Sequence, residues 1–381
     1  MADIAPPLPS RFPRLDGVRG VAILLVLMHQ FSLLGAPAGI LGRTVDLVLD
    51  RGWIGVQLFF VLSGFLITGI LLDARGKPGA WTRFALRRVL RIFPLYFLAL
   101  LLFTIMLPRL GLVPADWSGH AVWYWLFVSN WTQAFVGGAL PHFWSLAVEE
   151  QFYVLWPLAA LVRERKVVLA SCAALVLLAV AFRLAMRHGQ VSPEAIYMAT
   201  VSRMDALACG AAAAVLIRMP RVREGIARWE GPLWGAALAL LAAGFLLTHY
   251  DRTSPTGQVW GYLILSLDMG AGILLLAAAD ASRAPSRMPS GWLAGWPLRR
   301  LGLYSYAMYV FHKPLHDLVG RPLLAAAGLG NALAPGPGLA YLAAAIVATA
   351  AVGALSYHAF ERHFLALGRT PPAGMGGGRE M

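Results

Sequence analysis

The chain has little charge and almost no cysteine. Only 13% of its 381 residues are Asp, Glu, Lys or Arg, whereas 59% are hydrophobic. So few charges cannot cover a water-exposed surface, and this excludes a soluble globular protein. The two cysteines, Cys172 and Cys209, lie inside apolar segments. We therefore expect them to pack as small apolar residues and not to form a disulfide framework.

Apolar runs recur along the whole length instead, each of about 17 to 25 residues, which is long enough to cross a bilayer as a helix. No stretch between them could form a separate soluble domain. The sequence therefore predicts an all-α integral membrane protein, a bundle of about ten transmembrane helices in a lipid bilayer. The expected spans are 17–36, 52–72, 92–108, 143–162, 167–186, 200–217, 232–248, 259–279, 301–319 and 338–359.

The net charge of +13 lies mostly in alternate short loops. Such asymmetry indicates orientation, not nucleic-acid binding, and predicts a multi-pass protein of the cytoplasmic (inner) membrane with both termini in the cytoplasm. The stretch from Met1 to Arg14 has no signal cleavage site, so we expect the first apolar run to stay as an anchor. The basic residues of the inner loops are Arg75, Lys77, Arg83, Arg87, Arg88, Arg91, Arg163, Arg165, Lys166, Arg218, Arg221, Arg223, Arg228, Arg283, Arg287, Arg299 and Arg300.

One aromatic-rich segment, 120–135, does not fit this alternation. If it crossed the membrane, every later basic cluster would face outward. We therefore expect an interfacial or re-entrant segment on the outer side, with Trp117, Trp123, Trp125 and Trp131 at headgroup depth. Residues 368–381 are rich in Gly and Pro and are expected to be a disordered tail, which leaves 1–367 as the membrane domain.

His29 is the first candidate for chemistry, because it lies about ten residues inside the first apolar run. A histidine at that depth is costly unless a partner or a reaction uses it. A neutral imidazole there could accept a proton from a hydroxyl, with Asp16 and Arg19 nearer the inner surface. The alternative is that Asp16 and Arg19 anchor the helix at the interface while His29 bonds a neighbouring helix.

A second candidate is a run of arginines on the inner side. Arg87, Arg88 and Arg91 fall at helical spacing at the mouth of a membrane helix, where guanidinium groups can clamp phosphates. A nucleotide-like ligand would explain their convergence, and a positive-inside anchor is the alternative. Two adjacent carboxylates, Glu149 and Glu150, are costly in an apolar helix unless one binds a cation, orients a histidine or shares a proton. Favourable charge at a helix N-terminus accounts for one of them better than for two.

Other polar residues lie inside later spans. Arg203 and Asp205 are either a structural buried pair or substrate contacts, and Tyr306 and His312 are candidates for substrate binding. Three residues that close the last span are expected to be structural: Tyr357, His358 and Glu361.

Taken in order, seven segments of the chain resemble the acyltransferase-3 family of membrane-bound O-acyltransferases. They are LDGVRGVAILLVLMH (15–29), GVQLFFVLSGFLIT (55–68), RRVLRIFPLYF (87–97), FWSLAVEEQFYVLWPL (143–158), RMDALACG (203–210), GLYSYAMYVFHKPL (302–315) and SYHAFERHF (356–364).

The resemblance implies transfer of an acyl group, usually acetyl, from acyl-CoA to a hydroxyl of a glycan or other glycosylated acceptor, without a metal. It implies that His29 is catalytic, that Arg19 is its paired basic residue, and that Arg88 and Arg91 contact the nucleotide phosphates. Glu149 and Glu150 match the family's acidic motif. One departure concerns spacing: nine residues separate Arg19 from His29 where the common family pattern has ten. On an ideal helix the angle between them then becomes about 80°, unless a π-bulge restores a shared face.

We therefore predict that His29 acts as general base, with Glu149, Glu150 or Asp16 fixing its tautomer, or that it forms an acyl-histidine. A secondary transporter that uses His, Glu and Asp as a proton relay is the main alternative, and an inactive scaffold is a third. The sequence does not specify the acceptor, the acyl chain or the oligomeric state.

Overall fold

The protein is helical throughout the part that the structure describes. This computed structural model describes residues 8–33, 39–113, 117, 121–132, 140–161, 164–282, 289–330 and 333–368, and these residues contain no β-strand. The chain is an all-α integral membrane protein, as the sequence predicted. The expected tail 368–381 lies outside the described residues except for Gly368.

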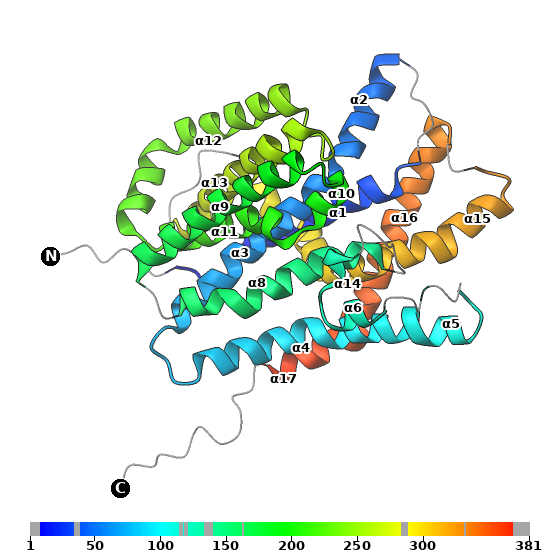
Figure 1. The fold of residues 1–381 in the computed structure, drawn as a ribbon, viewed down its shortest axis with the longest axis horizontal. Helices are drawn as coiled ribbons and strands as arrows, with labels where there is room; N and C mark the ends of the chain where they lie inside the picture. Colours follow the sequence, from blue (N-terminus) through cyan, green and yellow to red (C-terminus); the bar gives the residue numbers. More distant parts are fainter. Residues whose placement is uncertain are drawn as a thin grey trace, which may run out of the picture.

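Each of the ten expected spans coincides with a helix (Figure 1). In chain order these helices are α1 (Pro13–Phe31), α3 (Ile54–Ala74), α4 (Ala80–Leu100), α8 (Trp144–Ala160), α9 (Arg165–His188), α11 (Thr200–Leu216), α12 (Pro220–Thr248), α13 (Tyr262–Ala281), α14 (Trp296–Leu315) and α16 (Pro335–Ser356).

Shorter elements extend or connect them. They are α2 (Gly39–Asp50), η1 (Arg51–Trp53), η2 (Leu101–Met106), α5 (Leu107–Arg109), α6 (Ala121–Trp125), η4 (Ser129–Trp131), η5 (Pro141–Phe143), α10 (Pro193–Met198), η6 (Gly257–Gly261), η7 (Gly291–Ala294), η8 (His316–Gly320), α15 (Arg321–Ala326), η9 (Tyr357–Glu361) and α17 (Arg362–Leu367).

Two predicted helix starts were wrong by twelve residues, and they differ most from the structure. Helix α4 begins at Ala80, twelve residues before the expected start at 92, because charged side chains at a helix end do not prevent helix formation. Helix α12 begins at Pro220, where we expected 232, and it bends at Trp229, whose backbone is not helical. Pro232 follows that bend, and a proline in a helix removes one backbone hydrogen bond.

Seven helices within the described ranges are long and apolar enough to cross a membrane. The remaining three expected spans are α1, α8 and α14. Helix α1 carries Asp16 and Arg19, α14 carries Arg299 and Arg300, and α8 has only 17 residues. The three least lipid-like helices are therefore also the ones in which the sequence placed several candidate site residues.

Close helix packing holds these polar helices in place. A Cβ atom on Gly64 would lie 1.9 Å from the Leu207 carbonyl oxygen, and one on Gly210 would lie 1.9 Å from that of Val61, so α3 and α11 meet backbone to backbone. A Cβ atom on Gly302 would lie 2.0 Å from the Asp16 carbonyl oxygen. Small residues allow such approach where lipid supplies no hydrophobic drive between helices.

The helix ends that we expect on the inner side lie together at one end of the bundle. Arg14, at the start of α1, pairs with Asp280 of α13 at 2.7 Å, and Arg218, after α11, pairs with Asp73 of α3 at 2.7 Å. Arg75 donates to the carbonyl of Ala160 at the end of α8. The contacts group these ends as the alternating topology requires. Which compartment they face remains a prediction.

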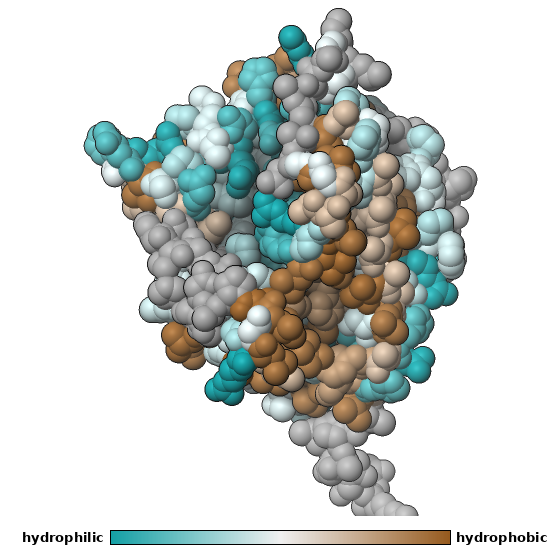
Figure 2. Space-filling model, turned by 90° about the vertical axis from the view of Figure 1, so that its right-hand side faces the viewer, coloured by the Kyte–Doolittle hydropathy of each residue, from teal (hydrophilic) through white to brown (hydrophobic). Residues whose placement is uncertain are grey.

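The described part of segment 120–135 contains only α6 and η4, both too short to span a membrane. Phe127 stacks on Tyr96 with ring centroids 4.2 Å apart, which holds the segment against α4. Trp123, Trp125 and Trp131 are exposed. Figure 2 views the molecule from the right-hand side of Figure 1, where apolar residues form a broad patch beside hydrophilic ones, as expected for a surface that meets both lipid and water.

Candidate functional site

A cavity of about 1030 Å³ lies among α1, α3, α4, α8 and α14, and the η9–α17 segment forms one more wall. Its volume is at the upper end of the range for pockets that bind small molecules and cofactors. Seven of the predicted site residues line it: Asp16, Arg19, Arg87, Arg88, Arg91, Glu149 and Tyr306. The bundle thus brings together four segments that lie far apart in the sequence.

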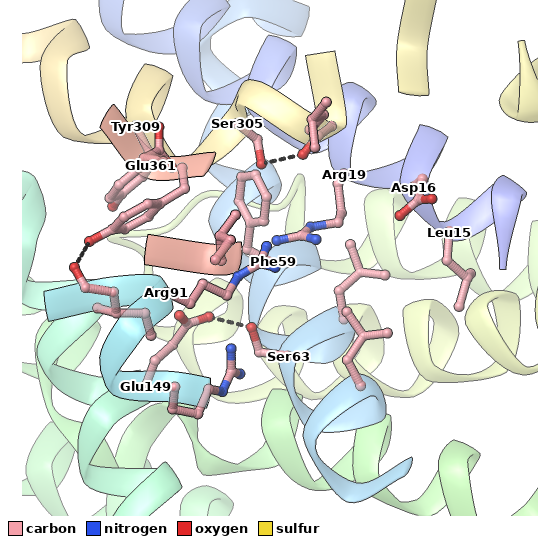
Figure 3. Close-up of a pocket in the computed structure, with 18 of the residues that line it drawn as sticks. Leu15, Asp16, Arg19, Phe59, Ser63, Arg91, Glu149, Ser305, Tyr309 and Glu361 are labelled. Atoms are coloured by element: carbon pink, nitrogen blue, oxygen red, sulfur yellow. Dashed lines mark hydrogen bonds between the residues drawn. The ribbon is translucent and has the colours of Figure 1, made fainter. Parts of the chain in front are cut away.

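Three arginines converge on this cavity from two helices. Figure 3 shows Arg19 of α1 and Arg91 of α4 directed toward one another, and Arg88 lies one helical turn before Arg91. None of the three has a carboxylate within ion-pair distance in the described ranges. The Nε atom of Arg88 is buried without a hydrogen-bond partner there. Like charges held together away from bulk water repel strongly, so this arrangement favours an anionic ligand.

Two contacts order the wall opposite Arg19. The guanidinium carbon of Arg88 lies 4.1 Å from the centre of the Tyr153 ring, a cation–π contact that fixes the side chain. Ser63 of α3 donates a hydrogen bond of 2.6 Å to Glu149 (Figure 3). Glu149 and Asp16 place carboxylates among the arginines, so the cavity holds both signs of charge with cations in excess.

Hydroxyl groups from α14 and α8 lie in other parts of the wall. Tyr306 donates to the carbonyl of Ile92 at 2.7 Å. Tyr309 and Ser145 share a hydrogen bond of 2.5 Å, and the Tyr309 hydroxyl also contacts the carbonyl of His142 at 2.9 Å. Both Tyr309 and Ser145 line the cavity, whereas His142 does not.

His29 does not line the cavity. Helix α1 is regular from Pro13 to Phe31, without a π-bulge, so the angle of about 80° between Arg19 and His29 is retained. His29 faces the junction of α2 and η1 instead. Its Nδ1 lies 3.3 Å from the carbonyl oxygen of Leu49 in α2, and its Cβ lies 2.9 Å from a Cβ built on Gly52 in η1. A carbonyl only accepts, so Nδ1 carries the proton and Nε2 has the lone pair. The expectation that a carboxylate fixes this tautomer was wrong, because a main-chain carbonyl occupies that position.

Four other predicted residues also lie away from the cavity walls. Arg203 and Asp205 are fully buried; Asp205 pairs with Arg183 at 2.7 Å, and the Arg203 guanidinium lies 4.4 Å from the Tyr262 ring centre. His312 is fully buried with Nδ1 2.7 Å from the Tyr309 carbonyl. Glu150 is the fourth, next to Glu149 but turned by about 100°. These contacts favour the structural alternative for Arg203 and Asp205.

Sequence reasoning missed several cavity residues. Tyr357 and Glu361, expected to be purely structural, line the wall, as do Ser63, Tyr153 and Arg300. Ser63 precedes Gly64 in the segment 55–68, and Tyr153 lies four residues after Glu149 in the segment 143–158. Both segments were singled out from the sequence, but only the packing of α3 against α8 shows that the two residues lie together. Within the described residues no group of three or more His, Cys, Asp and Glu has the arrangement of a metal site.

Comparison with known proteins identifies the family to which this chain belongs. The model of a family described as "Acyltransferase domain" matches residues 12–358. The chain belongs to the acyltransferase-3 family. That match covers every helix that lines the cavity up to the start of η9.

Named relatives agree with this assignment. YrhL of Bacillus subtilis (strain 168), named provisionally as a peptidoglycan O-acetyltransferase, is 28% identical over 92% of this chain and 54% of its own length. The peptidoglycan O-acetyltransferase OatA of Listeria monocytogenes is 26% identical over 80% of this chain and 49% of its own. The O-acetyltransferase OatA of Staphylococcus aureus (strain NCTC 8325) is 25% identical over 81% and 51%. The chain spans about half the length of these relatives. No solved structure matches it.

Proposed function

We propose that this protein transfers an acyl group, with acetyl as the expected one, from acyl-CoA to a hydroxyl of a carbohydrate acceptor. The observation that carries this proposal is the set of unpaired arginines in the cavity. Arg19, Arg88 and Arg91 would bind the diphosphate, because guanidinium forks match phosphate oxygens in pairs and need an anion there.

The cavity supports this donor by its shape as well as its charge. It runs along α3 from Ile70, near the inner end, to Val56, a separation of 14 residues or about 21 Å of helix. That length suits an extended pantetheine arm with its phosphates at the arginines. The thioester would then lie near the hydroxyls of Tyr309 and Ser145, which line that part of the cavity.

His29 is the base in this proposal. Val56 lines the end of the cavity, and Gly52, which packs against His29, lies four residues or about 6 Å of helix beyond it. The Nε2 lone pair of His29 is suited to accept the hydroxyl proton, since Nδ1 faces the Leu49 carbonyl. The acyl group has to move this distance, or the acceptor has to reach inward past Val56.

Glycan acceptors are proposed because the relatives named above include peptidoglycan O-acetyltransferases. Peptidoglycan itself is one candidate among carbohydrates. The acceptor is best found by comparing acetylation of isolated cell-envelope glycans from cells with and without the gene.

The direct experiment incubates the purified protein in lipid nanodiscs with acetyl-CoA carrying a labelled acetyl group. Appearance of free thiol together with label in an added glycan fraction supports the proposal. No thiol release with any glycan fraction would overturn it and would favour the transporter alternative. A His29→Ala variant should lose about 10²- to 10⁴-fold in transfer rate while its affinity for CoA stays unchanged.

A further inference from the structure

A second cavity opens beside the first at the end of the bundle where α3 ends and α4 begins. Its volume is about 310 Å³, and four basic side chains line it: Lys77, Arg83, Arg87 and Arg88. Arg87 and Arg88 line both cavities, so the two spaces share a wall of guanidinium groups. We call the smaller one the side cavity.

The basic residues of the side cavity have no acid to neutralise them. Its one acidic residue is Asp73, and Arg218 already binds both oxygens of that carboxylate, at 2.9 and 2.7 Å. No other carboxylate forms an ion pair with Lys77, Arg83, Arg87 or Arg88 in the described ranges. The side cavity therefore has the charge of a second anion site, formed by Lys77 and Arg83 beside the two arginines that it shares with the large cavity.

Helix geometry gives the separation of the two anion sites. Arg83 and Arg91 are eight residues apart on α4, about 12 Å along its axis, with Arg87 and Arg88 between them. A ligand with two anionic groups on one small framework could therefore occupy both sites. In CoA the diphosphate and the 3′-phosphate are attached to the same ribose, whereas a phosphopantetheine group on a carrier protein has a single phosphodiester.

We propose that the side cavity binds a second phosphate group of the donor, the 3′-phosphate of CoA, through Lys77 and Arg83. This inference rests on the proposed function and deepens it, because it makes the protein select acyl-CoA over donors that lack that phosphate. A phosphate headgroup of an anionic lipid has the same chemistry, and the experiment separates the two sources.

The experiment follows the logic of a double-mutant cycle. One change removes Lys77 and Arg83 from the protein, and the other removes the 3′-phosphate from the donor. KM is measured for acetyl-CoA and for acetyl-3′-dephospho-CoA with the wild type and with Lys77→Gln/Arg83→Gln, all in phosphatidylcholine nanodiscs. Removing the phosphate should raise the wild-type KM about tenfold, the loss of one charge-assisted contact. The double variant should show the same raised KM for acetyl-CoA and little further rise for the dephospho donor.

The matched control is Lys166→Gln/Arg221→Gln, which removes two positive charges from the same predicted side of the membrane without touching either cavity. Its KM for acetyl-CoA should stay within twofold of the wild type. An equal effect of the Lys77/Arg83 change on both donors would overturn the inference. The inference would also be overturned if the Lys77/Arg83 change raised KM only in a second set of nanodiscs that contain phosphatidylglycerol, because the site would then hold lipid. If the wild type released thiol from neither donor, the result would instead contradict the proposed function.

Discussion

Three helices in the wall of the large cavity differ from the outer helices of the bundle in hydropathy. Helices α9, α12 and α16 are long and apolar, and only 22%, 11% and 22% of their most apolar windows are buried. Helices α1, α8 and α14 are shorter or carry charge, yet they hold Arg19, Glu149 and Tyr306 in the cavity. Side chains that face lipid must be apolar, whereas chemistry requires polar groups inside. In this protein all three helices with a weak membrane signal line the cavity, and they share its walls with the more apolar helices α3 and α4.

The largest expected effect tests the arginine wall against arginines elsewhere. Arg88→Gln/Arg91→Gln should raise KM for acetyl-CoA about 100-fold, since each charge-assisted contact contributes about 1.5 kcal/mol. The Lys166→Gln/Arg221→Gln control removes equal charge from outside the cavity and should change KM by less than twofold. Equal effects of the two double variants would show that only overall charge matters.

A buried ion pair should matter far more for stability than an exposed one. Asp205→Asn breaks the fully buried contact with Arg183 and should lower the free energy of unfolding by about 3 to 5 kcal/mol. Asp73→Asn removes a partner of Arg218 from a carboxylate that is 66% exposed, and should cost less than about 1 kcal/mol. Denaturant titration in detergent measures both. A small loss for Asp205→Asn would mean that the interior is better hydrated than its burial indicates.

Glycines in the two regions should also respond in opposite directions. Gly64→Ala would place a methyl group 1.9 Å from the Leu207 carbonyl and should destabilise the protein by about 1 to 3 kcal/mol. Gly235→Ala on α12 meets nothing within 4 Å and should be neutral or slightly stabilising, since alanine favours a helix. Thermal unfolding midpoints distinguish these outcomes, and equal shifts would contradict the tight packing of α3 against α11.

Much of this contrast could be predicted from the sequence, but not its geometry. Apolar run length located all ten helices, and the spacing of Arg19 and His29 already implied an angle of about 80° between them. The contact of Ser63 with Glu149, and the presence of Tyr357 and Glu361 in the cavity, depend on how distant helices pack, which no local pattern specifies. The unexpected start of α4 at Ala80 matters most, because it carries Arg83 and Arg87 on the same helix as Arg91.

The smallest expected effect lies in the loop between α12 and η6, outside both regions. Partial burial raises the pKa of Asp251, whereas hydrogen bonds from Thr253 and Ser254 lower it. The hydrogen bonds have the larger combined effect, so the pKa of Asp251 lies below its usual value. A carboxylate with a lowered pKa stabilises the fold above its unfolded pKa of 3.8, and this contribution is lost as pH falls through the folded value. Asp251→Asn should therefore lower the melting temperature slightly at pH 7, and the difference should shrink as the pH falls below about 4. A difference independent of pH would mean that the charge plays no part.

The central claim is that the arginines of the large cavity bind the phosphates of an acyl-CoA donor. An experimental structure of the protein in nanodiscs with CoA tests it most directly. The account predicts diphosphate oxygens within about 3.2 Å of guanidinium nitrogens of Arg88 and Arg91, with the pantetheine arm directed toward Tyr309. CoA bound anywhere else on the protein, with this cavity filled by lipid or left to water, would contradict it.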